Sequence, residues 1–161
     1  MKLVSFIRDE HDYLGVLIDN TIFGMELLHP ELPNNMSLFL NYWEDFFPVA
    51  QAGVEFIKSG RISRDKGIPL QSVQLLAPVP FPTSCRDGYA FRQHVAAARR
   101  NRKVEMIPEF DQYPIFYFTN HHSIQGPGPV QCMPDHFQKL DFELEVAIVI
   151  CKAGRNIKAE E

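Results

Sequence analysis

Residues 2–28 are KLVSFIRDEHDYLGVLIDNTIFGMELL, a stretch in which three short runs have the composition of β-strands. The runs cover residues 2–7, 13–18 and 21–28. The pair Asp19-Asn20 separates the last two runs and suits a tight hairpin turn, because both residue types tolerate turn conformations. The stretch therefore predicts a small β-meander near the N-terminus.

The segment after the meander has the residue spacing of helices. Apolar and aromatic residues recur at helical intervals through residues 37–59. We expect Pro48 to divide this segment into two helices, because proline lacks an amide N–H, and Gly60 to end the second helix. Prolines are then frequent from 67 to 83, which is typical of an extended connector. We therefore expect a small N-terminal domain over residues 1–72 and a second domain over residues 73–161.

The second domain is expected to mix helix and strand. The sequence predicts one helix over residues 88–101 and strands over residues 115–119 and 140–151, with a glycine- and proline-rich loop between the strands. Residues 154–161 have the pattern of a strand exit followed by a helix that Asn156 would cap. The chain is therefore expected to be an α+β protein whose second domain ends before it is complete.

Composition limits the partners and the compartment. The 161 residues are 45% hydrophobic, enough for a packed core, and their net charge of -4 gives no basic field for nucleic acid. Three widely separated cysteines indicate a reducing compartment, so we expect a cytoplasmic location. The N-terminus is charged too early for a signal peptide, and no apolar stretch approaches the ~20 residues that cross a bilayer. We expect neither a nucleic-acid nor a membrane partner.

An acidic alternation marks the last expected strand. In LDFELEVAIVI, residues 140–150, the side chains of Asp141, Glu143 and Glu145 fall on one face of a strand and apolar side chains fall on the other. Two interpretations are open. The acidic face is solvated, as in many antiparallel sheets, or alternate carboxylates about 6.6 Å apart converge on one hard divalent cation. All-oxygen ligation favours Mg²⁺, Ca²⁺ or Mn²⁺ over zinc.

Asp87 and His94 form a second candidate group. They are seven positions apart in the sequence, so in one helix they would share a face, about 10 Å from each other. Structural roles are open for both: Asp87 as a helix cap, and His94 as a packed or exposed side chain. Arg102, near the end of the same helix, is the candidate for binding a substrate carboxylate, although cations there also complement the helix dipole. The aromatic residues 116–118 are expected in the core.

Three motifs together resemble the fumarylacetoacetate hydrolase family, metal-dependent enzymes that hydrolyse carbon–carbon bonds in diketo acids. The motifs are DGYAFRQH at 87–94, Gly-Pro-Gly at 126–128 and LDFELE at 140–145, within a match that spans residues 75–161. The LDFELE run is the most specific of the three. The Arg-Gln-His ending of the first motif points towards the fumarylacetoacetase branch of the family.

The resemblance implies a role for each matching side chain. Asp87, Glu143 and Glu145 take the positions of metal ligands, and the expected metal is Mg²⁺ or Ca²⁺, with Mn²⁺ as a further candidate. Tyr89 takes the position of a tyrosine that contacts substrate, and His94 that of the histidine that activates water. General-base catalysis of this kind typically contributes about 10²- to 10⁴-fold in rate.

The sequence also departs from the family's pattern. Thr119-Asn120-His121-His122-Ser123 stands where many relatives have a lysine, and a further metal-binding aspartate and the later barrel strands do not appear. Asp141 is not a ligand in the pattern and is expected to hydrogen-bond nearby backbone. Residues 73–161 are thus expected to be the first part of a mixed-β roll or barrel-like domain. The chain alone is expected to hydrolyse diketo acids poorly or not at all, and to form a homodimer or associate with a C-terminal part.

The function expected from these motifs is divalent-metal-dependent hydrolysis of carbon–carbon bonds in acylpyruvates or other diketo acids. Decarboxylation or tautomerisation of an oxo acid is an alternative, because the same enolate serves all these reactions. A non-catalytic small-molecule-binding or oligomerisation module is another. The motifs locate the metal ligands but do not specify the native substrate, the metal in the cell or the oligomeric state.

Overall fold

The computed structural model describes residues 1–158 and 160 and divides into two compact units, residues 1–80 with 125–161 and residues 81–124. The chain is an α+β protein, as expected, and its described residues form one curled antiparallel sheet, one two-stranded hairpin and few helices. The domain boundary at residue 72 stays a prediction. Among the described residues, no helix has both the length and the apolar character needed to cross a membrane.

The sheet of the first unit has the strand order β4-β3-β2-β1-β5. The strands are β1 Lys2–Arg8, β2 His11–Ile18, β3 Thr21–Gly24, β4 Ile68–Pro69 and β5 Gln74–Leu75. β1, β2 and β3 pair antiparallel in chain order, which confirms the meander. Ile18 pairs with Thr21 across the expected turn, where Asp19 has a φ of 54°. Aspartate tolerates this left-handed conformation better than most residues.

The sheet curls because its two edge strands are close in sequence. Four residues separate Pro69 at the end of β4 from Gln74 at the start of β5. In a flat sheet of five strands the outer strands would lie about 19 Å apart, four spacings of ~4.8 Å. Five residue steps reach at most about 18 Å, and the 3₁₀ turn at Leu70–Ser72 shortens that reach. Residues 68–75 therefore close the sheet into a half-barrel where a plain connector was expected.

The third strand is shorter than predicted. β3 ends at Gly24 and the chain continues as a single helical turn, α1 Met25–Leu28, so the strand expected over residues 21–28 was wrong in its second half. Met25 and Leu28 are both buried in the core. Residues three apart share a face of a helix but lie on opposite faces of a strand, so burial of both favours the helical turn.

Two helices follow, but they are divided at Tyr42 and not at Pro48. The helices are α2 Met36–Asn41 and α3 Trp43–Lys58. Tyr42 has φ -121° and ψ 42°, outside the helical region, and it caps both helices. Pro48 lies in the second turn of α3, so its missing N–H leaves only the carbonyl of Glu44 without a helical partner. Gly60, with a φ of 78°, follows the end of α3, as expected.

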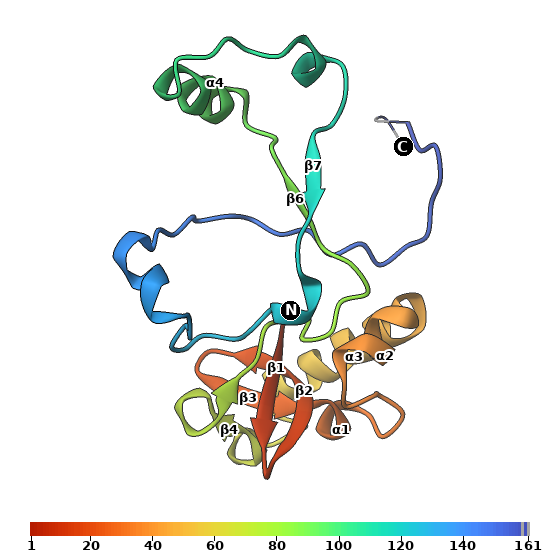
Figure 1. Cartoon of the computed structure of the whole chain (residues 1–161). Helices are drawn as coiled ribbons and strands as arrows, with labels where there is room; N and C mark the ends of the chain where they lie inside the picture. The colour runs from red at the N-terminus through yellow and green to blue at the C-terminus, as the bar shows by residue number, and fades with distance from the viewer. Residues whose placement is uncertain (159, 161) are drawn as a thin grey trace. The chain divides into compact units, whose positions relative to one another are not determined.

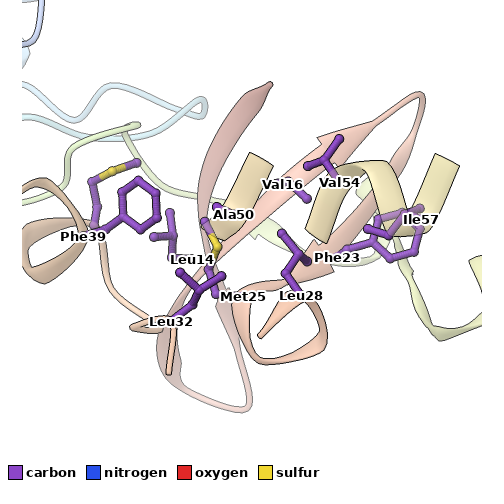
Figure 2. Close-up of a cluster of buried hydrophobic side chains, with 11 residues drawn as sticks. Leu14, Val16, Phe23, Met25, Leu28, Leu32, Phe39, Ala50, Val54 and Ile57 are labelled. Atoms are coloured by element: carbon purple, nitrogen blue, oxygen red, sulfur yellow. The ribbon is translucent and has the colours of Figure 1, made fainter. Parts of the chain in front are cut away.

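The core of the first unit lies between the sheet and these helices, as the side chains in Figure 2 show. Sheet residues such as Leu14 and Phe23 and helix residues such as Phe39 and Ile57 are at most 1% exposed. Gly53 of α3 packs directly on α1. A Cβ at Gly53 would lie 2.6 Å from the Cβ of Leu28, so the close approach of the two helices depends on this glycine.

The second unit is a β-hairpin with one helix. β6 Arg86–Gly88 pairs antiparallel with β7 Phe116–Phe118, and α4 Arg92–Asn101 lies in the connection between them (Figure 1). The strand near residues 115–119 is confirmed. The helix expected from residue 88 begins at Arg92 with Phe91 as its N-cap, because residues 87 and 88 are paired with β7. The helix-cap role of Asp87 was therefore wrong, and Asp87 and His94 do not share a helix face.

The strand expected over residues 140–151 does not form within the described structure. Residues 140–151 have no regular secondary structure, and Phe142, Leu144 and Val146 are 88%, 97% and 94% exposed. A strand exists only through pairing of its N–H and C=O groups, and no described strand lies beside this segment. The helix expected after residue 154 is not present as far as residue 158, and its later residues 159 and 161 lie outside the described part. Asn156 has a φ of 55°, in the left-handed region, and not the extended backbone of an N-cap.

Candidate metal and acid–base site

Asp87 lies on β6 directly across from Tyr117 on β7. The flanking pairs Tyr89–Ile115 and Cys85–Thr119 are joined by backbone hydrogen bonds of 3.0 and 3.3 Å, so by the alternation of an antiparallel ladder Asp87 and Tyr117 form a hydrogen-bonded pair. The Tyr117 hydroxyl donates to Oδ2 of Asp87 at 2.7 Å. The carboxylate is half-buried and is held at one of its two oxygens.

The side chain of Arg86, the residue before Asp87, lies on the face of the hairpin opposite to Asp87. The Arg86 guanidinium lies over the rings of Phe118, at 4.6 Å, and Phe116, at 5.7 Å. Alternation along the strand thus places the Arg86 cation and the Asp87 carboxylate on opposite faces. The guanidinium of Arg86 therefore contacts the two phenylalanine rings and does not face the Asp87 carboxylate.

His94 lies in the first turn of α4, where its ring packs against Tyr89. The two ring centroids are 6.0 Å apart with planes at 84°, and Tyr89 makes a second edge-to-face contact with Phe110 at 6.3 Å. Edge-to-face contacts of this kind orient aromatic rings. The Tyr89 hydroxyl is buried and has no hydrogen-bond partner within the part of the chain that the structure describes. A buried unsatisfied hydroxyl costs about 1–3 kcal/mol, which an oxygen of a bound ligand would recover.

An ion pair fixes the start of α4. Arg92 donates from Nε to Oδ1 of Asp111 at 2.8 Å and from Nη2 to Oδ2 at 3.0 Å. These hydrogen bonds, together with the opposite charge, hold the pKa of Asp111 below its ordinary value and raise the pKa of Arg92. The pair links the first turn of α4, which bears His94, to the 3₁₀ turn Pro108–Asp111.

An Asp111→Asn variant is expected to lower the melting temperature of the 81–124 unit slightly at pH 7 and by less near pH 2. The folded pKa of Asp111 is depressed, so its stabilising effect is present above the unfolded value of about 3.9 and is lost as the pH falls through the lower folded value. Thermal unfolding followed by NMR of the α4 amides checks this. An equal difference at both pH values would show that the ion pair is not the cause.

Arg102 is the C-cap of α4, with its backbone N–H bonded to the carbonyl of Ala98 at 3.2 Å. Its side chain is exposed. This position suits the helix dipole, and the substrate-binding role of Arg102 stays a prediction.

Glu143 and Glu145 lie in the exposed segment after the 3₁₀ turn Pro134–Lys139. Oδ1 of Asp141 accepts a hydrogen bond from the Phe142 N–H at 2.9 Å, which confirms the backbone contact expected of Asp141. No three His, Cys, Asp or Glu side chains of the described residues are gathered closely enough to hold a metal ion. Asp87 belongs to the 81–124 unit, and Glu143 and Glu145 belong to the other unit. Three carboxylates are a donor set that fits a hard divalent cation.

Tyr117 is the residue of this site that sequence reasoning missed. Residues 116–118 were expected in the core, but Phe116, Tyr117 and Phe118 are 46%, 61% and 67% exposed. The prediction was wrong because the hairpin carries no further layer on either face among the described residues of its unit. Aligning 87 with 117 in a hairpin register would have placed a tyrosine hydroxyl beside the aspartate.

Comparisons with known proteins agree with the motifs. Residues 83–161 match the family model described as fumarylacetoacetate (FAA) hydrolase C-terminal. The whole chain is 29% identical to human mitochondrial oxaloacetate tautomerase FAHD2B over 168 residues, 48% of that protein. It is 28% identical to rat mitochondrial oxaloacetate tautomerase Fahd2a, again over 48% of the relative, and 24% identical to the fumarylacetoacetate hydrolase domain-containing protein 2 homolog of Dictyostelium discoideum, over 50%.

The chain spans about half the length of the curated relatives it matches. Two of these relatives carry "mitochondrial" in their names, so the cytoplasmic location expected from the cysteines stays a prediction. The match of residues 83–161 covers the Asp87–His94 motif, the Gly-Pro-Gly loop and the Glu143/Glu145 run. The chain belongs, through residues 83–161, to the fumarylacetoacetate hydrolase family.

Proposed function

We propose that the chain is part of a divalent-metal-dependent enzyme that interconverts the enol and keto forms of a small oxo acid. The single observation that carries this proposal is the alignment of the whole chain with proteins named oxaloacetate tautomerase. Asp87, Glu143 and Glu145 would hold Mg²⁺ or Ca²⁺, or Mn²⁺, because all three offer hard oxygen ligands. The bound ion would polarise the substrate carbonyl and favour the enolate.

His94 is the proton carrier in this proposal. Conversion of an enol to a ketone removes a proton from the enol oxygen and adds one to the carbon next to the new carbonyl group, so no other reactant is consumed. An imidazole both accepts and donates protons near neutral pH, which suits a residue that does both in one cycle. The exposed His94 ring, oriented by its edge-to-face contact with Tyr89, is reachable by substrate.

Tyr89 and Arg102 would bind the substrate. The buried Tyr89 hydroxyl lacks a protein partner among the described residues and would donate to a substrate oxygen. Arg102 would pair with a carboxylate through its guanidinium, which matches carboxylate geometry. Both roles hold for any small oxo acid with a terminal carboxylate.

Hydrolysis of a carbon–carbon bond in an acylpyruvate is a second candidate function. It is favoured by the 87–94 motif, whose Arg-Gln-His ending resembles the fumarylacetoacetase branch. In this reaction His94 would remove a proton from the attacking water, and the departing fragment would leave as an enolate. The two candidate functions use the same metal ligands and the same base, His94. They differ in whether a water molecule attacks the substrate carbonyl.

The assay that tests the proposal follows the ultraviolet absorbance of enol oxaloacetate with Mg²⁺ and the purified enzyme of which this chain is proposed to be part. We expect the enol to decay faster than in buffer, and the acceleration to disappear when EDTA removes the metal. An acylpyruvate cleavage assay run in parallel decides between the two candidates. A protein that binds Mg²⁺ but accelerates neither reaction would overturn both and favour a non-catalytic binding module.

A further inference from the structure

The Tyr117–Asp87 contact does more than join the two strands of the hairpin. Strand pairing already fixes the backbones of both residues, and the contacts of Arg86 with the rings of Phe116 and Phe118 lie on the other face of the hairpin. A phenylalanine at position 117 would keep the aromatic ring of Tyr117 and lose only its hydroxyl group. The hydroxyl adds one directed interaction, the 2.7 Å hydrogen bond to Oδ2 of Asp87.

The hydrogen bond from Tyr117 restricts the orientation of the Asp87 carboxylate. A carboxylate that accepts a hydrogen bond at Oδ2 cannot rotate freely about its side-chain bonds, and the other oxygen is then presented in one direction. A carboxylate has about four lone-pair positions, so Oδ1 and the remaining lone pair of Oδ2 are still able to bind a cation. Such outer partners orient the side chains that ligate metals and tune their affinity.

We propose that Tyr117 is a positioning residue that holds Asp87 in the orientation needed to bind a divalent cation. This inference rests on the proposed function, because it takes Asp87 as a metal ligand. It assigns to Tyr117 a role that depends on its hydroxyl and not on its ring. Loss of that hydroxyl reduces metal affinity by about 10- to 100-fold, the range found when outer-shell partners of metal ligands are removed.

The experiment is calorimetric titration of the full chain with Mg²⁺ and with Mn²⁺, comparing wild type with Tyr117→Phe. The expected result is an affinity about 10- to 100-fold weaker in the variant. Tyr113→Phe is the matched control, because Tyr113 is a 65% exposed tyrosine of the same unit, and it should bind as wild type does. The electron paramagnetic resonance spectrum of bound Mn²⁺ gives a second readout, which should change in Tyr117→Phe and not in Tyr113→Phe.

A double-mutant comparison separates positioning from a structural effect. In an Asp87→Asn background, Tyr117→Phe should cause no further loss of metal affinity, because the ligand it positions is already gone. An equal loss in both backgrounds, or Tyr117→Phe binding as tightly as wild type, would overturn the inference and leave the metal-binding proposal standing. Wild type that binds neither ion would instead overturn the proposed function and this inference with it.

Discussion

Replacing Glu143 and Glu145 together by glutamine is expected to weaken Mg²⁺ binding by more than about 100-fold, beyond the 10- to 100-fold loss seen for outer partners of a metal site. The reason is that each substitution exchanges an anionic ligand for a neutral amide while leaving size and shape almost unchanged. Calorimetric titration of the variant with Mg²⁺ and Ca²⁺ measures the effect.

The control for this pair is Asp141→Asn, which changes the charge in the same segment by the same chemistry. Asp141 bonds the backbone N–H of Phe142 and is outside the expected ligand set, so its variant should bind metal as wild type does. If the glutamine double variant also binds as wild type does, the acidic residues are simply solvated and the metal site is not built from them.

A His94→Gln variant is expected to lower kcat for enol–keto conversion by about 10²- to 10⁴-fold, the usual contribution of a positioned acid–base group. Glutamine keeps hydrogen-bonding capacity but cannot carry the proton. Metal affinity should stay at the wild-type value, because His94 is a base and not a ligand in this account. Stopped-flow measurement of enol decay at saturating substrate gives kcat directly.

His122→Gln is the matched control for His94. His122 is an exposed histidine of the same unit, in the 3₁₀ turn His121–Ser123, and has no role in the proposed chemistry. Its variant should retain wild-type kcat. Loss of metal binding in His94→Gln, or an unchanged kcat, would remove His94 from the role of proton carrier.

Local signals in the sequence predicted the N-terminal unit well. The Asp19-Asn20 turn, the meander and the end of α3 near Gly60 follow from residue types that favour turns and left-handed backbone. The errors came from tertiary packing. Burial of Met25 and Leu28 together converts the end of a predicted strand into a helical turn, and Tyr42 rather than Pro48 divides the helices.

The acidic segment shows the limit of periodicity. Alternation over residues 140–150 predicts which side chains would share a face, but a strand also needs a neighbouring strand to pair with. None of the described strands provides that pairing, and the apolar side chains of Leu144 and Ile148 are 97% and 83% exposed. The alternation therefore selected Glu143 and Glu145 as candidate ligands, but the strand that it predicted for them does not form within the described structure.

In the second unit, strand pairing changes the predicted surroundings of Asp87. The spacing of Asp87 and His94 would give them one face if a single helix held both, but pairing with Tyr117 places Asp87 on a strand. The Tyr117 hydrogen bond could not be predicted from spacing, because the two residues are 30 apart in the sequence and only the hairpin register pairs them. The motif at residues 87–94 lies within residues 83–161, the range that matches the family model.

We propose that Asp87, Glu143 and Glu145 bind one hard divalent cation. The most direct measurement is a crystal structure of the protein grown with Mn²⁺, in which anomalous scattering locates the metal independently of the protein atoms. We expect a single strong anomalous peak with oxygens of all three carboxylates about 2.0–2.6 Å away, the range for hard divalent ions. A peak bound by other side chains, or none at these carboxylates, would contradict it.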